Sequence, residues 1–476
     1  MAKTAYRQND RFIVLNNTKL TKFTNAFTIV ELLVVIVVIG ILASITIVSY
    51  TGISQKATAA SLQSDLGSSA SQLKAYQAIY GSFPTVMTNN CPTAPVSDSS
   101  FCLKTSANNT IGYSSTGTIF NLANVNTGGM TYTMTNSSAI ALHYGNLAAA
   151  GTPTIAAGSG TYSVTVSPEG NSVYVTNYND STVSMYSRNT STGALTALAT
   201  PTIPTGTNPH FVVVSSDGTS VYATNYTSGT ISMYSRNTAT GALTALATPT
   251  IPTGTNPYNI VVSSDGTSVY AISYGTNSIS MYSRNTNTGA LTALATPTIA
   301  TGVTPFGMAI SADGTSVYAA NITSNTISMY SRNTTTGALT ALATPTIATG
   351  TNPYSVAISA DGATVYATNI TSNSISMYSR NTSTGALTAL ATPTIATDQS
   401  PLNIVASPDG TSVYATNITS NTISIYKRNI STGLLTAPTA AITSAANPYG
   451  IAISADGATV YTANNSTNVV SIYNRY

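Results

Sequence analysis

A repeat of about 48 residues fills the last two thirds of the chain and limits its possible folds more than any other feature. An acidic residue that opens a tight turn recurs once per copy, at Glu169, Asp217, Asp265, Asp313, Asp361, Asp409 and Asp456. Five successive intervals are 48 residues long and the last is 47. Seven copies with a period in this range are typical of propellers and solenoids.

The pattern inside one copy separates these two architectures. The fifth copy reads NPYSVAISADGATVYATNITSNSISMYSRNTSTGALTALATPTIA, from Asn352 to Ala396. It contains four short β-rich runs, divided by Asp-Gly, Thr-Ser-Asn and Asn-Thr-Ser-Thr-Gly turn signals. Four strands per unit and no helix predict a propeller blade.

The two ends of the repeat region predict how the propeller closes. The seventh copy stops at Tyr476 after its third strand, whereas the run from Leu147 to Val164 aligns with a fourth strand leading into the next blade. We therefore expect residues 146–476 to form an all-β, seven-bladed propeller. In this three-plus-one closure, the first strand completes the last blade and leaves no open sheet edge.

A local motif resembles a known family. The string VYVTN at Val173–Asn177 follows SPEG and precedes STVSMYSRNTSTGAL. It resembles the YVTN family of seven-bladed propellers, which occur in surface-layer proteins and have lactonase-like relatives. The resemblance spans about 330 residues and implies the fold, but propellers host many unrelated functions.

The start of the chain has the charge order of an export segment. Residues 1–26 carry five basic side chains and one acid, a net charge of +4, so the +3 of the whole chain comes from this stretch and the rest of the chain carries −1. Phe27 to Ser49 follows with Glu31 as its single ionisable side chain. Its 23 residues would form about 34 Å of helix, enough to cross a membrane. No nucleic-acid partner is expected, since the remaining chain has no basic cluster.

The string AFTIVELLVVIVVIGILA, which begins at Ala26, resembles the processing motif of type IV pilins and pseudopilins. The resemblance implies cleavage by prepilin peptidase between Ala26 and Phe27 and methylation of the new Phe27 amine. Glu31 would neutralise the same amine of a neighbouring subunit during assembly. The implied pilin α+β module has a leader (1–26), a long helix for the membrane and filament core (27–80, apolar over 27–49) and a small antiparallel head (81–145).

Cys91 and Cys102 are the only cysteines. In an exported chain they predict one disulfide; two free thiols are the alternative. A metal site is not expected, because two thiolates with no nearby His are too few ligands.

The repeat gives little sign of catalysis, because the same polar groups recur in every blade. The Asp-Gly pairs are interpreted as turns. One arginine per copy, at Arg188, Arg236, Arg284, Arg332, Arg380, Arg428 and Arg475, is interpreted as solvated or paired with local acids and carbonyls rather than as an anion ligand.

One position does vary between copies, where the innermost strand begins. It holds Tyr162, His210, Tyr258, Phe306, Tyr354, Leu402 and Tyr449, which we call the inner ring. These side chains are expected at one mouth of the central channel. There they either form a rim that stacks on sugars or peptides, or plug the channel by packing on neighbouring blades. His210 resembles the Pro-His element of lactonase-like propellers, but a lone imidazole without an acid or metal does not predict hydrolysis.

Together these features predict a non-enzymatic, type IV pilin-like filament subunit without a cofactor or metal. It would enter the cytoplasmic membrane as a precursor, polymerise through its N-terminal helices with the pilus assembly machinery, and display the propeller outside the cell for adhesion to a glycan or cell-surface target. Two alternatives remain open: a minor pilin or secretion pseudopilin with a propeller tip adhesin, and a membrane-tethered lactonase-like enzyme.

Overall fold

The computed structural model describes residues 61–476, except 63, 85, 89, 108, 116–119, 127–130, 136–140, 143–145, 437–440 and 476. Residues 62–476 form one compact unit. The predictions made for Ala26, Phe27, Glu31 and the apolar run 27–49 therefore lie outside the described residues. Among the residues that are described, no helix is long and apolar enough to cross a membrane.

The N-terminal part of the described chain begins with a helix over residues 61–80. Leu62, Leu66, Leu73 and Tyr76 are all buried, so one helical stripe packs inward at the spacing of a 3.6-residue turn. Gly81, with φ of +79°, ends the helix in the left-handed conformation that glycine permits.

Short elements and a disulfide follow this helix. Strands β1 (Val86–Thr88) and β2 (Cys91–Ala94) pair, and a 3₁₀ turn, η1, spans Ser99–Phe101. The predicted disulfide between Cys91 and Cys102 is present. An antiparallel sheet comes next, in the order β3 (Asn109–Ser115), β4 (Phe120–Asn126), β5 (Thr131–Thr135) and β6 (Ala141–Leu142).

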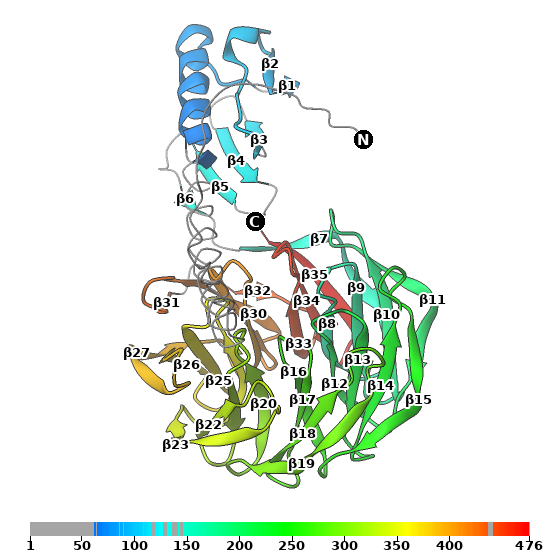
Figure 1. Ribbon diagram of the computed structural model, residues 1–476. Helices are drawn as coiled ribbons and strands as arrows, with labels where there is room; N and C mark the ends of the chain where they lie inside the picture. Colours follow the sequence, from blue (N-terminus) through cyan, green and yellow to red (C-terminus); the bar gives the residue numbers. More distant parts are fainter. Residues whose placement is uncertain are drawn as a thin grey trace, which may run out of the picture. The chain divides into compact units, whose positions relative to one another are not determined.

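The predicted seven-bladed propeller is confirmed, and its blades surround a central axis (Figure 1). The innermost strands are β8 (Thr161–Val166), β12 (Pro209–Val214), β16 (Pro257–Val262), β20 (Pro305–Ile310), β24 (Pro353–Ile358), β28 (Pro401–Ala406) and β33 (Pro448–Ile453). The second strands are β9 (Ser172–Asn177), β13 (Ser220–Asn225), β17 (Ser268–Ser273), β21 (Ser316–Asn321), β25 (Thr364–Asn369), β29 (Ser412–Asn417) and β34 (Thr459–Asn464).

The third strands are β10 (Thr182–Arg188), β14 (Thr230–Arg236), β18 (Ser278–Arg284), β22 (Thr326–Arg332), β26 (Ser374–Arg380), β30 (Thr422–Arg428) and β35 (Val469–Arg475). The outer strands of the first five blades are β11 (Leu195–Pro204), β15 (Leu243–Pro252), β19 (Leu291–Ala300), β23 (Leu339–Ala348) and β27 (Leu387–Ala396). In the sixth blade, β31 (Leu435–Thr436) and β32 (Ile442–Thr443) both pair with β30.

The seventh blade closes as the sequence predicts. Its outer strand is β7 (Leu147–Ala156), the first strand of the region, which pairs antiparallel with β35 at the C-terminal end. Val470 lies opposite Ile155, and Arg475 lies opposite Leu147. Because the first strand is held in the last blade, unfolding at this seam must separate the two ends of the propeller.

The hydrophobic core lies between blades. One cluster joins Tyr222, Ile231 and Met233 of the second blade to Val269 and Tyr282 of the third. An equivalent cluster joins the seventh blade to the first across the seam. Every residue of each second strand is buried, because both sheet faces pack on a neighbouring blade.

The recurring arginines bind the blades to one another. Arg332 of the fourth blade pairs with Asp265 of the third at 2.8 Å, and Arg188 of the first pairs with Asp456 of the seventh at 2.9 Å. The same pairing recurs in Arg236–Glu169, Arg284–Asp217, Arg380–Asp313, Arg428–Asp361 and Arg475–Asp409. The pairing with acids is therefore confirmed. A solvated position is not, since six of the seven arginine side chains are 0% exposed.

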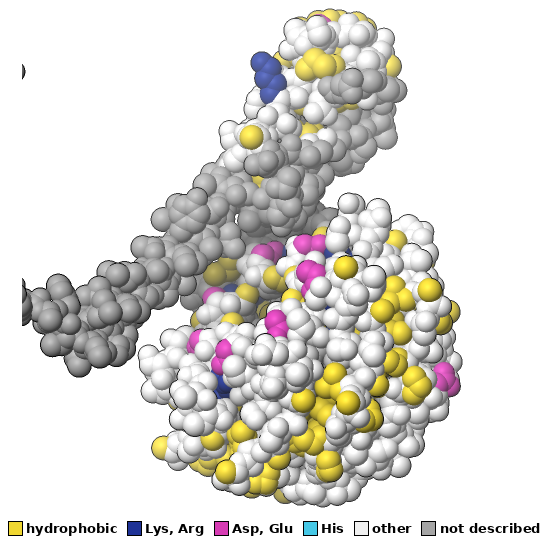
Figure 2. Space-filling model, turned by 45° about the vertical axis from the view of Figure 1, so that its right-hand side comes forward, with side chains coloured by type: hydrophobic (Ala, Val, Ile, Leu, Met, Phe, Trp, Pro, Cys, Tyr) yellow, Lys and Arg dark blue, Asp and Glu magenta, His cyan; other side chains and the backbone are white. Residues whose placement is uncertain are grey.

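The opposite ends of the blades differ in charge. Every Lys and Arg of residues 146–476 occupies one of the last two positions of a third strand. Each third strand is about 20 Å long. Antiparallel pairing places its start beside the start of the innermost strand, so the basic side chains lie about 20 Å from the point where the innermost strands begin. Few charged side chains appear on the face of the propeller drawn in Figure 2.

Candidate active site at the axial mouth

The inner ring residues meet where the innermost strands begin, an end of the channel that we call the axial mouth. The ring centroids of Tyr162 and His210 are 4.4 Å apart, those of His210 and Tyr258 3.8 Å, and those of Tyr258 and Phe306 4.2 Å. Tyr354 continues the series at 5.1 Å from Phe306, and Tyr449 closes it at 4.6 Å from Tyr162. Leu402 is buried in the same cluster. The structure thus brings together all seven side chains that the sequence singled out.

A β-bulge lies at this end of each innermost strand. In the third blade the register shifts between Pro257 and Asn259, and the other six blades shift at the equivalent point. A bulge interrupts the strict alternation of side chains and can re-aim one of them. Two consecutive residues of one strand, Tyr258 and Asn259, therefore both line the channel.

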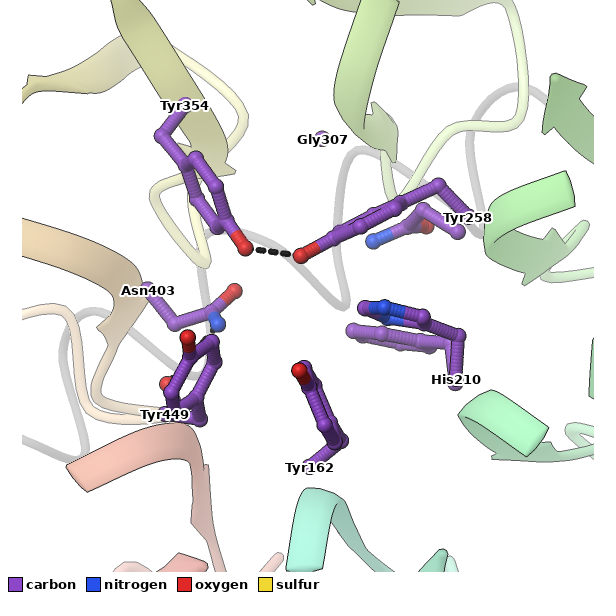
Figure 3. Close-up of a pocket in the computed structure, with 9 residues that line it drawn as sticks. Tyr162, His210, Tyr258, Gly307, Tyr354, Asn403 and Tyr449 are labelled. Atoms are coloured by element: carbon purple, nitrogen blue, oxygen red, sulfur yellow. Dashed lines mark hydrogen bonds between the residues drawn. The ribbon is translucent and has the colours of Figure 1, made fainter. Parts of the chain in front are cut away.

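The side chains leave only a small cavity between them. Its volume is about 10 Å³, which is close to the space that a single water molecule requires. The hydroxyls of Tyr258 and Tyr354 are hydrogen-bonded to each other across it (Figure 3). The geometry agrees with rings that fill the channel, so a larger ligand has to bind above them or displace them.

His210 is an uncharged group in this site. It is 6% exposed, and burial lowers the pKa of its imidazole to about 3. No hydrogen bond to either ring nitrogen occurs among the described residues. At neutral pH the imidazole therefore offers one donor and one acceptor and no charge.

Tyr162, Tyr258 and Tyr354 of the inner ring are also held in the neutral form. Burial, together with the neighbouring phenols, raises the pKa of Tyr258 well above its ordinary value, and burial raises that of Tyr354. The pKa of Tyr162 is raised mainly by burial and next by Tyr449. Each phenol therefore keeps its proton at neutral pH and can donate it in a hydrogen bond.

The residues that follow the inner ring are functional candidates that the sequence reasoning missed. Asn259 and Asn403 both line the cavity. Asn403 Nδ2 donates to the Tyr449 carbonyl at 2.8 Å. Asn259 is 5% exposed, and its buried Oδ1 has no hydrogen-bond partner within the described part of the chain. Simple alternation along a strand would turn these side chains away from the channel. Comparison of the copies, which carry Ser, Phe, Asn, Gly, Ser, Asn and Gly at this position, could have shown them.

The described residues hold no group of three or more His, Cys, Asp or Glu side chains that could bind a metal ion. The residues that line the mouth cavity are aromatic, amide, imidazole and glycine groups. They can donate and accept hydrogen bonds, stack on a ring and exclude water, and none of them is charged at neutral pH.

The chain matches the family model described as lactonase, 7-bladed beta-propeller, over residues 128–255, 247–350 and 389–476. No curated protein matches it. A solved structure described as a "putative 6-phosphogluconolactonase" from Bacteroides uniformis is 25% identical, with a TM-score of 0.54, over 70% of this chain and 95% of that one.

Two more distant structures share the fold. A second protein of the same description, from Bacteroides fragilis, is 22% identical, with a TM-score of 0.55, over 72% of this chain and 96% of that one. The periplasmic gluconolactonase of Pseudomonas aeruginosa is 17% identical, with a TM-score of 0.52, over 69% of this chain and 98% of that one. At these identities the likeness shows the fold alone.

The family match corrects the functional expectation. The sequence predicted a non-enzymatic filament subunit with an adhesive propeller, and the match to lactonases contradicts both the filament function and the absence of an enzyme. The physical reason is visible in the mouth. Repetition of polar groups in every blade argues against an active site among them, and the repeated Arg and Asp residues do lie at the other end of the blades. The few unlike groups, such as His210, Asn259 and Tyr354, converge in one cavity.

Proposed function

Because the chain belongs to the lactonase family of seven-bladed β-propellers, we propose that it hydrolyses a cyclic ester at the axial mouth. The observation that carries this proposal is the convergence there of an imidazole, two amides and several phenols, all from positions that differ between otherwise similar blades. Positions that pack the blades together remain nearly constant, whereas the mouth positions vary, and this contrast favours ligand chemistry over blade packing.

The neutral groups of the mouth suit this reaction. Water adds to the lactone carbonyl, the ring C–O bond breaks, the ring oxygen takes up a proton, and a hydroxy acid is released. Negative charge develops on the carbonyl oxygen during the addition, and donors aimed at that oxygen stabilise it. The phenols of Tyr258 and Tyr354 remain protonated and can supply such donors once a ligand separates their hydroxyls. The uncharged His210 can orient the attacking water.

The N-terminal sequence supports a tethered enzyme. A basic leader precedes the apolar run 27–49, which is long enough to enter a membrane. In our proposal, prepilin peptidase cleaves between Ala26 and Phe27, the apolar run holds the chain at the cytoplasmic membrane, and the propeller lies outside the cell.

Hydrolysis by the full chain tests the proposal. D-glucono-1,5-lactone releases an acid on opening, so base consumption at constant pH measures the rate above the spontaneous reaction. Tyr258→Phe and Tyr354→Phe each remove one donor and should lower kcat at least tenfold. Tyr330→Phe removes a buried hydroxyl in the body of the fourth blade, where it bonds the Ala300 carbonyl, and should leave kcat within twofold. A rate equal to that of buffer for this and other sugar lactones would overturn the proposal.

A further inference from the structure

A second circle of positions surrounds the inner ring, at the residue directly after each second strand. It holds Tyr178, Tyr226, Tyr274, Ile322, Ile370, Ile418 and Asn465. Tyrosine occupies the first three blades, isoleucine the next three and asparagine the seventh. The mouth is therefore chemically two-sided, and we call Tyr178, Tyr226 and Tyr274 the tyrosine arc.

The tyrosine arc lies against the inner ring and remains accessible. Tyr178 and Tyr226 contact His210, with ring centroids 5.6 and 5.4 Å away. Tyr274 packs edge-on against Phe306 at 5.4 Å and is 38% exposed. Tyr178 and Tyr226 are half-buried. The arc thus offers partly exposed aromatic rings beside the inner ring, and aromatic surface of this kind can stack on the C–H face of a sugar.

A buried acceptor lies among the inner ring residues. Asn259 Oδ1 has no hydrogen-bond partner among the residues that the structure describes, although its side chain is almost fully buried. Such an orphan acceptor is costly, and native proteins usually satisfy it with water or a ligand. The adjoining cavity of about 10 Å³ has room for one hydroxyl group. A hydroxyl entering from the mouth would satisfy Asn259 and align the rest of its ring with the arc.

The charges of the propeller disfavour an anionic ligand here. All eight of its Lys and Arg side chains lie at the far end of the blades, about 20 Å away. Two acids, Asp180 and Asp398, lie in turns at the mouth end. A phosphate at the mouth would therefore find no cation among the described residues of the propeller.

We propose that the axial mouth selects an uncharged, hexose-sized ring, stacked on the tyrosine arc of the first three blades with one hydroxyl donating to Asn259 Oδ1. This inference rests on the proposed function and names its substrate class. It differs from the phosphorylated sugar lactone in the description of the Bacteroides uniformis structure. Discrimination comes from missing cations rather than from a steric block.

Binding can be measured without hydrolysis. Methyl β-D-glucopyranoside has no ester, so saturation-transfer NMR and titration of the full chain report affinity alone, with glucose 6-phosphate as the anionic comparison. Tyr226→Ala and Tyr274→Ala should each weaken binding about 5- to 10-fold. Ile322→Ala and Ile370→Ala change the equivalent position of the fourth and fifth blades and should weaken it less than 2-fold. Asn259→Ala should weaken it about 10-fold.

The outcomes separate this inference from the proposed function. Equal losses for the Tyr and Ile variants, or tighter binding of glucose 6-phosphate, would overturn the inference even if lactones are hydrolysed. Selective binding of the glucoside without hydrolysis of any lactone would uphold it and defeat the proposed function. Near-UV circular dichroism of each variant shows whether a loss of glucoside binding reflects unfolding. Because Tyr274 is exposed, Tyr274→Ala should disturb the fold least.

Discussion

The ion pairs that join the arginine of each third strand to the acid of the preceding blade, which we call the arginine clasps, support a quantitative prediction. Arg332 is the clearest case. The side chain is 0% exposed, and its guanidinium donates six hydrogen bonds. Five of them go to the third blade, two of these to Asp265 at 2.8 and 3.1 Å and one to the Tyr270 hydroxyl at 2.9 Å. Arg332→Met keeps an apolar stem of similar length and removes the charge and all five N–H donors.

The expected loss follows from the burial of each partner. Breaking a buried ion pair by removing one member costs about 3–5 kcal/mol. Asp265 is 36% exposed and can be rehydrated, and the Tyr270 hydroxyl still donates to the Gly337 carbonyl at 2.6 Å. We therefore expect the lower end, about 3 kcal/mol. Asp265→Asn keeps an oxygen for its own turn but leaves the fully buried Arg332 charge without its counter-ion, so it should cost at least as much, about 3–5 kcal/mol.

Urea unfolding of the full chain measures these losses. The chain has 29 Tyr and no Trp, so near-UV circular dichroism follows the packing of its tyrosines. Thr296→Ala, at an exposed outer-strand position, is the control and should change stability by less than about 0.5 kcal/mol. The double variant should show a coupling of about 1–2 kcal/mol between Arg332 and Asp265. If Arg332→Met were as stable as the control, the clasps would contribute nothing to blade cohesion and the reasoning would fail.

Three further predictions follow. Hydrogen bonds from Ser311, Thr315 and Arg380 outweigh the effect of partial burial and lower the pKa of Asp313 to about 2; its stabilisation is present above the unfolded value near 4, so the thermal midpoint should fall as pH drops from about 4 to 2. Because the pKa of His210 is about 3, the kcat profile should show no inflection near pH 6.5, and such an inflection would place an ordinary histidine in the mechanism. Gly307→Ala would set its Cβ 2.5 Å from the Tyr354 carbonyl oxygen, whereas the Cβ of Gly151→Ala would meet no atom of the described residues within 4 Å apart from its chain neighbours. The unfolding midpoint of Gly307→Ala should therefore lie well below that of Gly151→Ala.

The architecture of the propeller could be predicted because its information is periodic. Acidic turn residues 48 apart, four β-rich runs per copy and an unmatched first strand fix the number of blades, the strands per blade and the closure through β7. The clasps could be predicted only in part. Sequence spacing shows that Arg332 recurs with its copies, but not that its partner is Asp265 in the preceding blade, because that contact depends on how neighbouring sheets pack.

The site could be predicted as a ring of positions but not as a chemical environment. Tyr162, His210 and Tyr354 meet as expected because they start innermost strands. Asn259 was missed, since a bulge at the strand start breaks the period of two on which strand patterns rest. The sequence alone also could not predict that His210 is uncharged, because its lowered pKa depends on burial by rings from other blades.

A nearly exact repeat changes how residues should be weighed for function. In this chain, groups that recur in every blade, such as Arg332 and Asp265, are fully used in joining blades, so their chemistry is unavailable to a ligand. The groups of the inner ring and the tyrosine arc, which differ between blades, lie around the one place where all seven blades meet. Symmetry would give a ligand seven equivalent orientations, whereas the change from tyrosine at Tyr274 to isoleucine at Ile322 leaves one side of the mouth distinct. A reaction at a single carbonyl requires that asymmetry, because water, donor and leaving oxygen must approach the ring from defined directions.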